Sequence, residues 1–433
     1  MQGALTRTVL PIGWLPAFMA DRAKEGPVRL DIRPGGGDRT RVLVIEPHGG
    51  GHHATYLRWI VNAIVARGWT AVVALTARTL ANPLLSIWST SVARVEIRII
   101  PVCPPDAEAM GRLGQLARQL RYWLLFRRLI HAEAACVPLS AVIVPYIDYC
   151  FFACALLGAP AGRLPWTAIS MRLRVSEGTG AFAPIPWRWR CARRVLASGS
   201  LRALFAINPS VKEVPAGWLS GEARAKLHYL PDPAEPIPAI DRGASRRELK
   251  LPEQGLVILV FGAINERKGV FELVRALLSD ATLDSYTVVV AGVQSDPVRQ
   301  WILNGPGSQL RERGRLCVID AVLTDAEEAF LFSAADVVWL GYIDHQFMSG
   351  VMVQAARSGL PVVACNRGEM GQLVTRHQMG MAVDPARIPE VQAALRALTK
   401  ESLRREIGNR ARSVFTRNTP GNLQDVILDS LAL

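Results

Sequence analysis

Long apolar runs and a cysteine framework are missing from this chain of 433 residues, and its first residues resemble a secretory signal only poorly. A helix that crosses a bilayer needs about 18 or more consecutive apolar residues. The apolar run at 151–157 is far too short, so we expect no membrane-spanning helix. Before residue 20, only Arg7 precedes an apolar stretch that proline and glycine interrupt, which is unlike a signal peptide. The seven cysteines are odd in number and scattered, which fits reduced thiols. We therefore predict a cytoplasmic protein that can also bind the inner face of the membrane.

Histidine is scarce too, and three of the seven histidines fall within residues 48–53, beside three glycines. Neighbouring histidines on a flexible loop do not define a tetrahedral site, and no cluster of Cys, His or carboxylate has ligand spacing, so we predict no metal. Glycines let a substrate approach the backbone, and a histidine beside them can act as a general base or bind phosphate. We take His52 and His53 as candidate catalytic residues and Gly50 and Gly51 as candidate binding residues. The alternative is that this loop only shapes a turn.

Acidic residues are outnumbered, because 50 lysines and arginines stand against 37 aspartates and glutamates, and the formal net charge is +13. Such a surface favours anionic partners. Residues 111–131 hold five arginines, no acid, and interleaved leucine and aromatic residues, a pattern typical of a basic helix on an anionic membrane surface. The predicted membrane or acceptor face consists of Arg118, Arg121, Trp123, Arg127 and Arg128. The alternative is a core-facing helix with an arginine-rich solvated side. No nucleic-acid-binding signature accompanies the charge, so we expect no nucleic-acid partner.

Apolar runs alternate with helical patterns along the chain. In the C-terminal half, strands are expected at 257–261, 287–291, 316–319, 337–340 and 360–364. In the N-terminal half, they are expected at 41–46, 70–75, 95–100, 141–144, 167–170 and 204–207. Strands that alternate with helices imply parallel sheets. We predict an α/β fold of two Rossmann-like, doubly wound domains.

A stretch rich in proline and charge divides the chain at 236–252 and is the expected linker. We expect an irregular extension at 1–39, an N-terminal domain at 40–235, a C-terminal domain at 253–415, and a final helix at 416–433.

Two loops of the C-terminal half have the composition of a phosphate site. Lys268 follows strand 257–261, and Ser349 and Gly350 begin a helix after strand 337–340. In parallel sheets the ligand crevice lies beyond the carboxyl ends of the strands, so both loops should face it. The free N–H groups of a helix start bind phosphate, and a lysine adds positive charge. A solvated surface lysine and a turn glycine are the alternatives.

One carboxylate of the N-terminal half has a comparable position. Asp148 follows strand 141–144, at the edge where an α/β domain presents catalytic groups. We take it as a candidate catalytic residue, with a role as the N-cap of the next helix as the alternative.

An ordered series of motifs in roughly the last two fifths of the chain resembles the C-terminal domain of GT-B glycosyltransferases, in particular the glycosyltransferase family 4 group: Phe261-Gly262, Lys268-Gly269, Ser349-Gly350, Gln354-Ala355, 359–364 and Gly368. The resemblance implies two domains that face a cleft, with a nucleotide sugar bound mainly by the C-terminal domain and an acceptor bound by the N-terminal domain. It also implies that Lys268 holds the diphosphate and that the final helix returns to the first domain. With the two glycines of the histidine loop, the predicted donor-binding set is Gly50, Gly51, Gly262, Arg267, Lys268, Gln346, Ser349, Gly350, Val351 and Gln354.

The chain departs from this family at charged positions. Gln346 and Gln354 stand where the family has a pair of glutamates, and Gln372 stands where it often has a further glutamate. Ala263 stands where the family has an arginine, although Arg267 is nearby. Met171-Arg172 stands where the family has the catalytic histidine of its N-terminal domain. Glutamine keeps the hydrogen-bonding capacity of glutamate but loses its charge.

We predict a glycosyltransferase, with a hexosyl group expected, that uses a nucleotide sugar and a glycan or lipid-linked acceptor in polysaccharide biosynthesis. UDP-sugars are favoured over GDP-sugars, no cofactor is expected, and retention of the anomeric configuration is the family default only. Two alternatives stay open: a noncatalytic glycosyltransferase-like subunit that binds a partner or lipid, and a sugar-nucleotide epimerase or hydrolase. The lost charges favour the first alternative, whereas Lys268 and the glycine turn oppose it.

Overall fold

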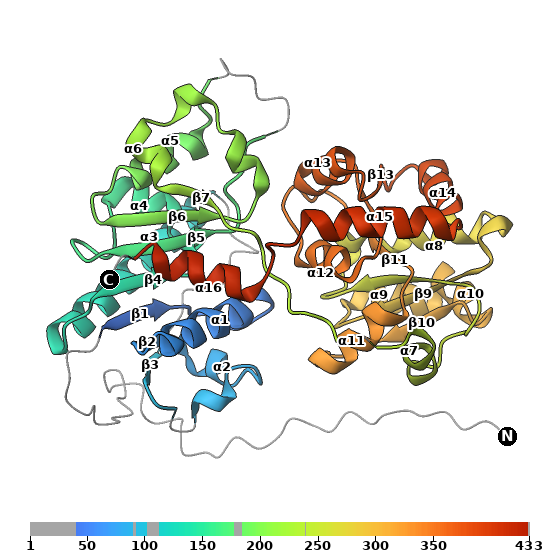
Figure 1. Cartoon of the computed structure of the whole chain (residues 1–433), viewed down its shortest axis with the longest axis horizontal. Coiled ribbons are helices and arrows are strands. Elements are labelled where there is room, and N and C mark those ends of the chain that lie inside the picture. Colours follow the sequence, from blue (N-terminus) through green and yellow to red (C-terminus); the bar gives the residue numbers. More distant parts are fainter. Residues whose placement is uncertain (1–39, 90–91, 102–111, 177–183, 239, 432–433) are drawn as a thin grey trace.

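The computed structural model describes residues 40–89, 92–101, 112–176, 184–238 and 240–431. These ranges form two domains side by side, each a parallel sheet between layers of helices (Figure 1). The extension expected at 1–39 lies outside the described residues. The prediction of two Rossmann-like α/β domains is confirmed.

The N-terminal domain contains a seven-stranded sheet with the order β3-β2-β1-β4-β5-β6-β7. Its strands are β1 (Arg41–Ile45), β2 (Thr70–Thr76), β3 (Val95–Ile100), β4 (Ala141–Val144), β5 (Trp166–Ser170), β6 (Leu201–Ala206) and β7 (Leu227–Tyr229). All neighbours pair in parallel, so helices cover both faces and the inner strands are mostly apolar. Strand β7 was not expected, because its three residues are only partly buried at the sheet edge and form no apolar run.

The C-terminal domain contains a six-stranded parallel sheet with the order β10-β9-β8-β11-β12-β13. Its strands are β8 (Leu256–Phe261), β9 (Tyr286–Ala291), β10 (Leu316–Ile319), β11 (Val337–Leu340), β12 (Val362–Cys365) and β13 (Gly380–Val383). The unexpected strand is again an edge strand, since β13 begins with glycine and buries only its last residue. The two strands that were not expected, β7 and β13, therefore lack the apolar run that marks the predicted ones.

Helices cover both faces of each sheet. In the N-terminal domain they are α1 (His52–Ala66), α2 (Ala77–Leu80), α3 (Arg112–Cys136), α4 (Phe151–Leu157), α5 (Trp187–Leu196) and α6 (Gly221–Ala225). The C-terminal domain contains α7 (Arg242–Glu248), α8 (Val270–Leu278), α9 (Asp296–Asn304), α10 (Pro306–Glu312), α11 (Asp325–Ala334), α12 (Gly350–Ser358), α13 (Gly368–His377), α14 (Ile388–Ala397) and α15 (Glu401–Val414). Helix α11 begins at a capping box of Thr324 and Glu327, as its sequence predicts. Across the described ranges, every helix falls short of the length and apolarity needed to span a membrane.

Helix α3 turns its aromatic side into the core. Trp123 is 7% exposed, and its indole N–H donates to Gly158 O at 2.9 Å. The prediction that Trp123 lies on a membrane face is wrong, because its ring packs between α3 and the turn after α4. Arg118 is half-buried, with its guanidinium 5.2 Å from the centroid of the Tyr122 ring. The exposed side of α3 carries the other expected residues, Arg121, Arg127 and Arg128, together with Leu113, Leu116 and Leu124.

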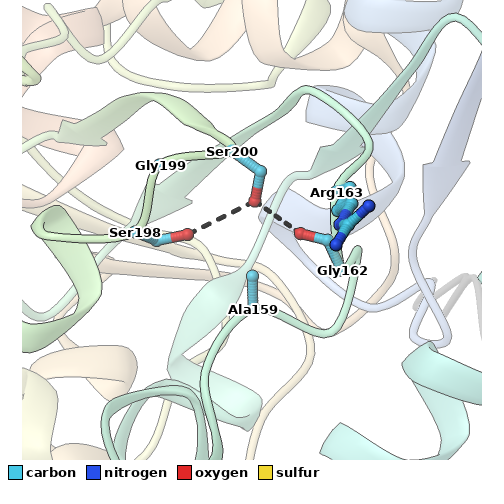
Figure 2. A pocket seen from close by; sticks show the side chains of 6 residues that line it. All are labelled: Ala159, Gly162, Arg163, Ser198, Gly199 and Ser200. Atoms are coloured by element: carbon cyan, nitrogen blue, oxygen red, sulfur yellow. Dashed lines mark hydrogen bonds between the residues drawn. The ribbon is translucent and has the colours of Figure 1, made fainter.

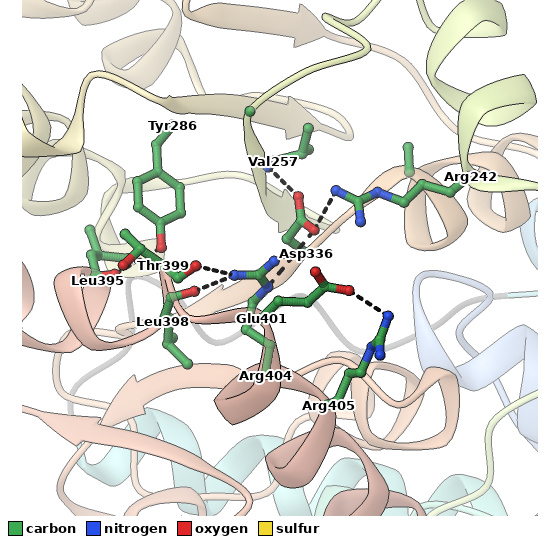
Figure 3. Close-up of polar contacts among 12 residues, drawn as sticks. Arg242, Val257, Tyr286, Asp336, Leu395, Leu398, Thr399, Glu401, Arg404 and Arg405 are labelled. Atoms are coloured by element: carbon green, nitrogen blue, oxygen red, sulfur yellow. Dashed lines mark hydrogen bonds and ion pairs between the residues drawn. The ribbon is translucent and has the colours of Figure 1, made fainter.

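Within the expected linker, helix α7 is attached to the C-terminal sheet by buried charges. The Arg246 guanidinium is 2% exposed and donates to Asp336 Oδ2 at 2.7 Å, while Arg242 lies 2.6 Å from Oδ1 of the same carboxylate. Asp336 also accepts the N–H of Val257 at 2.7 Å, and Arg404 approaches from α15 (Figure 3). A buried charge is costly unless it is paired, and the buried charges of Arg246 and Asp336 pair with each other. Residues 242–248 therefore pack as part of the C-terminal domain.

The chain passes between the domains twice. The first crossing runs through Asp232, whose carbonyl oxygen accepts from Asn418 Nδ2 of the second crossing at 2.7 Å. The second crossing leads to α16 (Pro420–Asp429), which lies against α1 of the N-terminal domain (Figure 1). There Gln424 Nε2 donates to Trp59 O at 3.1 Å. The two crossings thus touch each other and form one hinge region.

Candidate functional site

The strand order of each sheet reverses at a single point, between β1 and β4 in one domain and between β8 and β11 in the other. In open parallel sheets a ligand crevice forms at such a point, beyond the carboxyl ends of the strands. The loops that leave these four strands carry most of the residues predicted from the sequence.

Lys268 lies at the end of the short helix η6 (Glu266–Lys268) after β8. The residue is 7% exposed, so the alternative of a solvated surface lysine is wrong. Its Nζ donates to Phe261 O at 3.0 Å and to the Tyr342 hydroxyl at 2.6 Å. An ammonium group has three N–H donors, so these two bonds orient it and leave one donor for a ligand.

Glycines bring the two C-terminal loops together around this lysine. A Cβ on Gly269, which has φ +65°, would lie 2.0 Å from Gly341 O, so only glycine allows this close approach. A Cβ on Gly262 would lie 3.5 Å from Lys268 Nζ and 4.0 Å from a methyl carbon of Val351. The structure therefore gathers three of the predicted donor-binding residues, Gly262, Lys268 and Val351.

Helix α12 begins beside them. Ser349 is its N-cap and makes no side-chain capping hydrogen bond, and its hydroxyl oxygen lies 3.4 Å from that of Tyr342. The first N–H groups of a helix have no partner within the helix and attract anions. The helix start and the Lys268 ammonium thus lie on either side of the Tyr342 hydroxyl.

The other predicted polar residues of this domain, Arg267, Gln346 and Gln354, contact groups other than the Lys268 ammonium. Arg267 Nη1 lies 3.1 Å from His345 Nδ1, and burial, followed by the Arg267 charge, lowers the pKa of His345 to about 4. Gln354 is 6% exposed, and its Nε2 donates to Glu235 O in the first crossing at 3.3 Å. Gln346 Oε1 accepts from Arg174 Nη2 of the N-terminal domain at 3.4 Å. Gln346 therefore bridges the domains, whereas Gln354 fixes the hinge.

In the N-terminal domain, a buried carboxylate organises the histidine loop. Glu46 is 1% exposed and accepts hydrogen bonds from the His48 N–H at 3.0 Å and from the Tyr149 hydroxyl at 3.2 Å. His53 Nδ1 lies 3.1 Å from Glu46 Oε2. A carboxylate beside Nδ1 favours the tautomer with the proton on that nitrogen, which leaves Nε2 as an acceptor. His53 is therefore oriented as a general base would be.

Tyrosine rings surround this pair. Tyr149 stacks on Tyr122 with ring centroids 4.8 Å apart, and the ring centroids of Tyr146 and His53 are 4.7 Å apart. His48 Nε2 lies 2.6 Å from the Tyr122 hydroxyl oxygen. Burial, and then the negative charge of Glu46, raise the pKa of the Tyr149 hydroxyl, which keeps it protonated as a donor.

His52 reaches the other domain. A Cβ on Gly350 would lie 3.0 Å from His52 Cε1 and 3.8 Å from a carboxylate oxygen of Asp232. Burial raises the pKa of Asp232, and the nearby His52 and the hydrogen bond from Tyr56 oppose this rise. The predicted catalytic loop and the predicted donor-binding helix start therefore meet directly, whereas Gly50 and Gly51 are exposed at the rim.

Asp148 lies after β4, at the predicted edge of the sheet, but it does not cap the next helix. The N-cap of α4 is Cys150, without a side-chain cap, so Asp148 does not cap that helix. Its carboxylate is buried and accepts from the Ser170 hydroxyl at 2.9 Å and from the Met171 N–H at 2.7 Å. Burial raises the pKa of Asp148, and these hydrogen bonds oppose the rise. Asp148 therefore shapes the loop after β5 rather than facing a substrate.

A shallow hollow of about 450 Å³ lies elsewhere on the N-terminal domain. It is lined by Ala159, Gly162, Arg163, Ser198, Gly199 and Ser200, and the Ser200 hydroxyl donates across it to Gly162 O at 2.7 Å (Figure 2). These residues precede β5 and β6, at the opposite edge from the strand ends that carry the candidate site.

Sequence reasoning missed the tyrosines of the site. Tyr146 and Tyr149 follow β4 beside Asp148, so the rule that selected Asp148 could have found them. Tyr342 follows β11 in the same way. Tyr122 lies in the middle of α3 and gives no local signal, because only the packing of α3 brings it to the histidine loop.

Comparison with known proteins supports a glycosyltransferase. Residues 241–414 match the family described as Glycosyl transferases group 1. No curated protein matches the chain in sequence. Among solved structures, Anabaena Alr3699/HepE in complex with UDP and glucose aligns with a TM-score of 0.63 at 17% identity, over 91% of this chain and 100% of that one.

Two further solved structures have similar TM-scores, identities and coverages. Sucrose-phosphate synthase from Thermosynechococcus elongatus has a TM-score of 0.66 at 16% identity, over 91% of this chain and 98% of that one. WaaG, a glycosyltransferase involved in lipopolysaccharide biosynthesis, has a TM-score of 0.59 at 17% identity, over 89% and 99% of the two chains. At such low identity these similarities establish the shared two-domain fold.

Proposed function

We propose that this protein is a glycosyltransferase of the family 4 type that transfers a hexosyl group from a nucleotide sugar to an acceptor held by the N-terminal domain. The observation that carries the proposal is the contact between His52 and Gly350, which joins the two strand edges at the start of α12. A donor on that helix start would lie between Lys268 and the histidine loop.

The chemistry follows from the groups at this point. Transfer leaves a nucleoside diphosphate, and its developing charge would be stabilised by the Lys268 ammonium and the free N–H groups of α12. No metal or other cofactor is needed for that step. His53, oriented by Glu46, would accept a proton from the attacking hydroxyl if the reaction inverts the anomeric centre. Retention remains the family default.

For the donor we propose a UDP-sugar rather than a GDP-sugar. The similar HepE structure contains UDP and glucose, and another was solved with UDP-glucose. For the acceptor we propose a glycan or lipid-linked intermediate of polysaccharide biosynthesis. The exposed arginines and leucines of α3 would place the enzyme on an anionic membrane surface, at the cytoplasmic face, without nucleic acid as a partner.

A noncatalytic subunit is the second candidate, and Gln354 favours it. The residue stands where the family has a glutamate, and its amide is committed to the hinge carbonyl of Glu235. An epimerase or hydrolase of the same fold is the third candidate and would convert the donor without any acceptor. Product analysis with the nucleotide sugar alone separates the third candidate from a transferase.

The decisive measurement is calorimetric titration of the protein with UDP, GDP, ADP, dTDP and CMP, repeated with Lys268→Ala. We expect UDP to bind most tightly and the substitution to weaken it by roughly 10-fold to 100-fold, since a charge-assisted hydrogen bond contributes about 1.5–3 kcal/mol. Lys400→Ala, at an exposed lysine far from the site, is the matched control. If none of the five nucleotides binds, the noncatalytic candidate replaces the transferase.

A further inference from the structure

The loop after β5 is rigidly built, although the proposed chemistry gives it no role. The Ser170 hydroxyl accepts from the Leu173 N–H at 3.0 Å, and Asn208 Nδ2 donates to the carbonyls of Met171 and Leu173, both at 3.0 Å. Asn208 Oδ1 in turn accepts the Met348 N–H of the facing C-terminal loop at 3.1 Å. Arg172 and Arg174, which alternate with these residues, are therefore held on a fixed backbone at the domain boundary.

A third arginine joins them from α5. Arg188 Nη1 lies 3.8 Å from Asp148 Oδ1, and its guanidinium lies 5.4 Å from the centroid of the Phe152 ring. The other oxygen of the same carboxylate, Asp148 Oδ2, accepts the N–H of Met171 at 2.7 Å, so Arg188 and the loop that carries Arg172 and Arg174 lie against one side chain. Asp148 is buried and already accepts two hydrogen bonds from the loop, so positive charge is in excess here.

Gln346 leaves this excess of positive charge in place, because its neutral side chain brings no negative charge to Arg174. Arg174 Nη2 donates to Gln346 Oε1 at 3.4 Å, and its guanidinium lies 5.7 Å from the centroid of the Phe347 ring. A glutamate at this position would form an ion pair with Arg174, whereas the amide offers it only a neutral hydrogen-bond acceptor. The glutamine therefore keeps the guanidinium available to a negative group from outside.

We propose that Arg172, Arg174 and Arg188 form an anion site for the acceptor, whose recognised part carries a phosphate or a carboxylate. Planar guanidinium groups bind both anions through paired hydrogen bonds, which makes arginine rather than lysine suited to this task. The inference rests on the proposed function in calling the ligand an acceptor. The site lies across the domain boundary from Lys268, so one cleft would hold a donor diphosphate on one side and an acceptor anion on the other.

The test compares sugars that carry an anionic group with a neutral sugar. Protein saturated with UDP, so that the diphosphate site is filled, is titrated calorimetrically with glucose 6-phosphate, glucuronate and glucose. Dioctanoyl phosphatidic acid below its micelle concentration provides the same phosphate on a lipid. We expect the anionic probes to bind at least tenfold more tightly than glucose. A preference for the lipid probe would assign the anion to a lipid-linked acceptor, and a preference for the sugar phosphate would assign it to a soluble one.

Two substitutions locate the site. Arg174→Gln removes one charge, and Gln346→Glu leaves the arginine in place but supplies it with an internal partner. Both should weaken the preferred anion at least tenfold, with a smaller loss of UDP affinity. Arg193→Gln, at an exposed arginine of the same α5, is the control and should change anion binding less than twofold.

Three outcomes would overturn the inference: equal binding of glucose and the anionic probes, an equal loss in the Arg193→Gln control, or a loss in Arg174→Gln that falls on UDP instead. If wild-type protein binds no nucleotide, the proposed function fails. In that case, titration of the same anionic probes and glucose without UDP tests the anion site independently of nucleotide binding.

Discussion

At the scale of single residues, Lys268 and Tyr342 act as a pair. The lysine has its ammonium 2.6 Å from the Tyr342 oxygen and 4.3 Å from the centroid of the tyrosine ring. The ring therefore offers both a hydrogen-bond acceptor and a polarisable face to the charge. The contact directs the nearly buried ammonium toward the start of α12, where the Ser349 hydroxyl lies 3.4 Å from that of Tyr342.

Tyr342→Phe separates these two contributions, because it keeps the ring and removes the hydroxyl. We expect UDP affinity to fall by about threefold to tenfold, the value of one net hydrogen bond of about 0.5–1.5 kcal/mol. Lys268→Ala should cost more, since it removes the charge itself. Calorimetric titration of both variants with UDP provides the measurement. A Tyr342→Phe protein that binds UDP as wild type does would show that the tyrosine only packs against the lysine.

Among the secondary-structure elements, helix α3 has one buried aromatic face and one exposed face that carries leucines and arginines. Tyr122 and Phe126 are fully buried, whereas Leu113 is 85% exposed and Leu124 is 45% exposed. The helical period puts these leucines on one side with three of the arginines. Exposed leucines flanked by arginines are the composition that binds an anionic bilayer interface.

Charge reversal on this face tests its role. Arg121→Glu with Arg128→Glu should reduce binding to phosphatidylcholine vesicles that contain phosphatidylglycerol by more than tenfold, because each basic residue near an anionic surface contributes about 1 kcal/mol. Arg311→Glu with Arg313→Glu, at exposed arginines of the C-terminal domain, carries the same change in net charge. Co-sedimentation measures the bound fraction. Equal losses in both double variants would mean that the attraction is not specific to α3.

The elements also show where sequence reasoning succeeds. Inner strands such as β8 and β9 are buried on both faces, so their apolar runs are readable from the sequence alone. The edge strands β7 and β13 are partly exposed and carry no such run. Helix α7 stands in a charged stretch, and its place in the fold depends on Asp336, some 90 positions away, which no local pattern reveals.

At the scale of the whole molecule, each half of the candidate site could be predicted, but their meeting could not. Clustered histidines and glycines selected the histidine loop, and the rule that ligands lie at the carboxyl ends of parallel strands selected the Lys268 loop. The contact between His52 and Gly350 depends on how two domains pack, as do the bonds of Gln346 and Gln354. Family resemblance placed these glutamines in a donor site, whereas packing directs one toward an arginine and the other toward the hinge.

One buried carboxylate forms hydrogen bonds between the two domains. Glu369, in the first turn of α13, is 2% exposed and accepts from both the N–H and the hydroxyl of Ser210 in the other domain. Burial raises the pKa of Glu369, and the two bonds from Ser210 oppose the rise. The closed arrangement therefore binds a proton more readily than an open one in which water reaches the carboxylate. Closure should weaken as the pH rises through the raised pKa.

Ser210→Ala and Glu369→Gln should consequently move the domains in opposite directions. The alanine removes a hydrogen bond to a carboxylate, about 1.5–3 kcal/mol, and should give a larger radius of gyration in small-angle X-ray scattering at pH 8. The glutamine imitates the protonated acid and should make the radius independent of pH between 5 and 8. Glu213→Ala breaks the exposed ion pair with Arg376 between the same domains, whose side chains are 52% and 55% exposed, and should change little. A radius that stays the same in all three variants at both pH values would mean that closure does not depend on Glu369, and the apolar core around α16 would then be the element that holds the domains together.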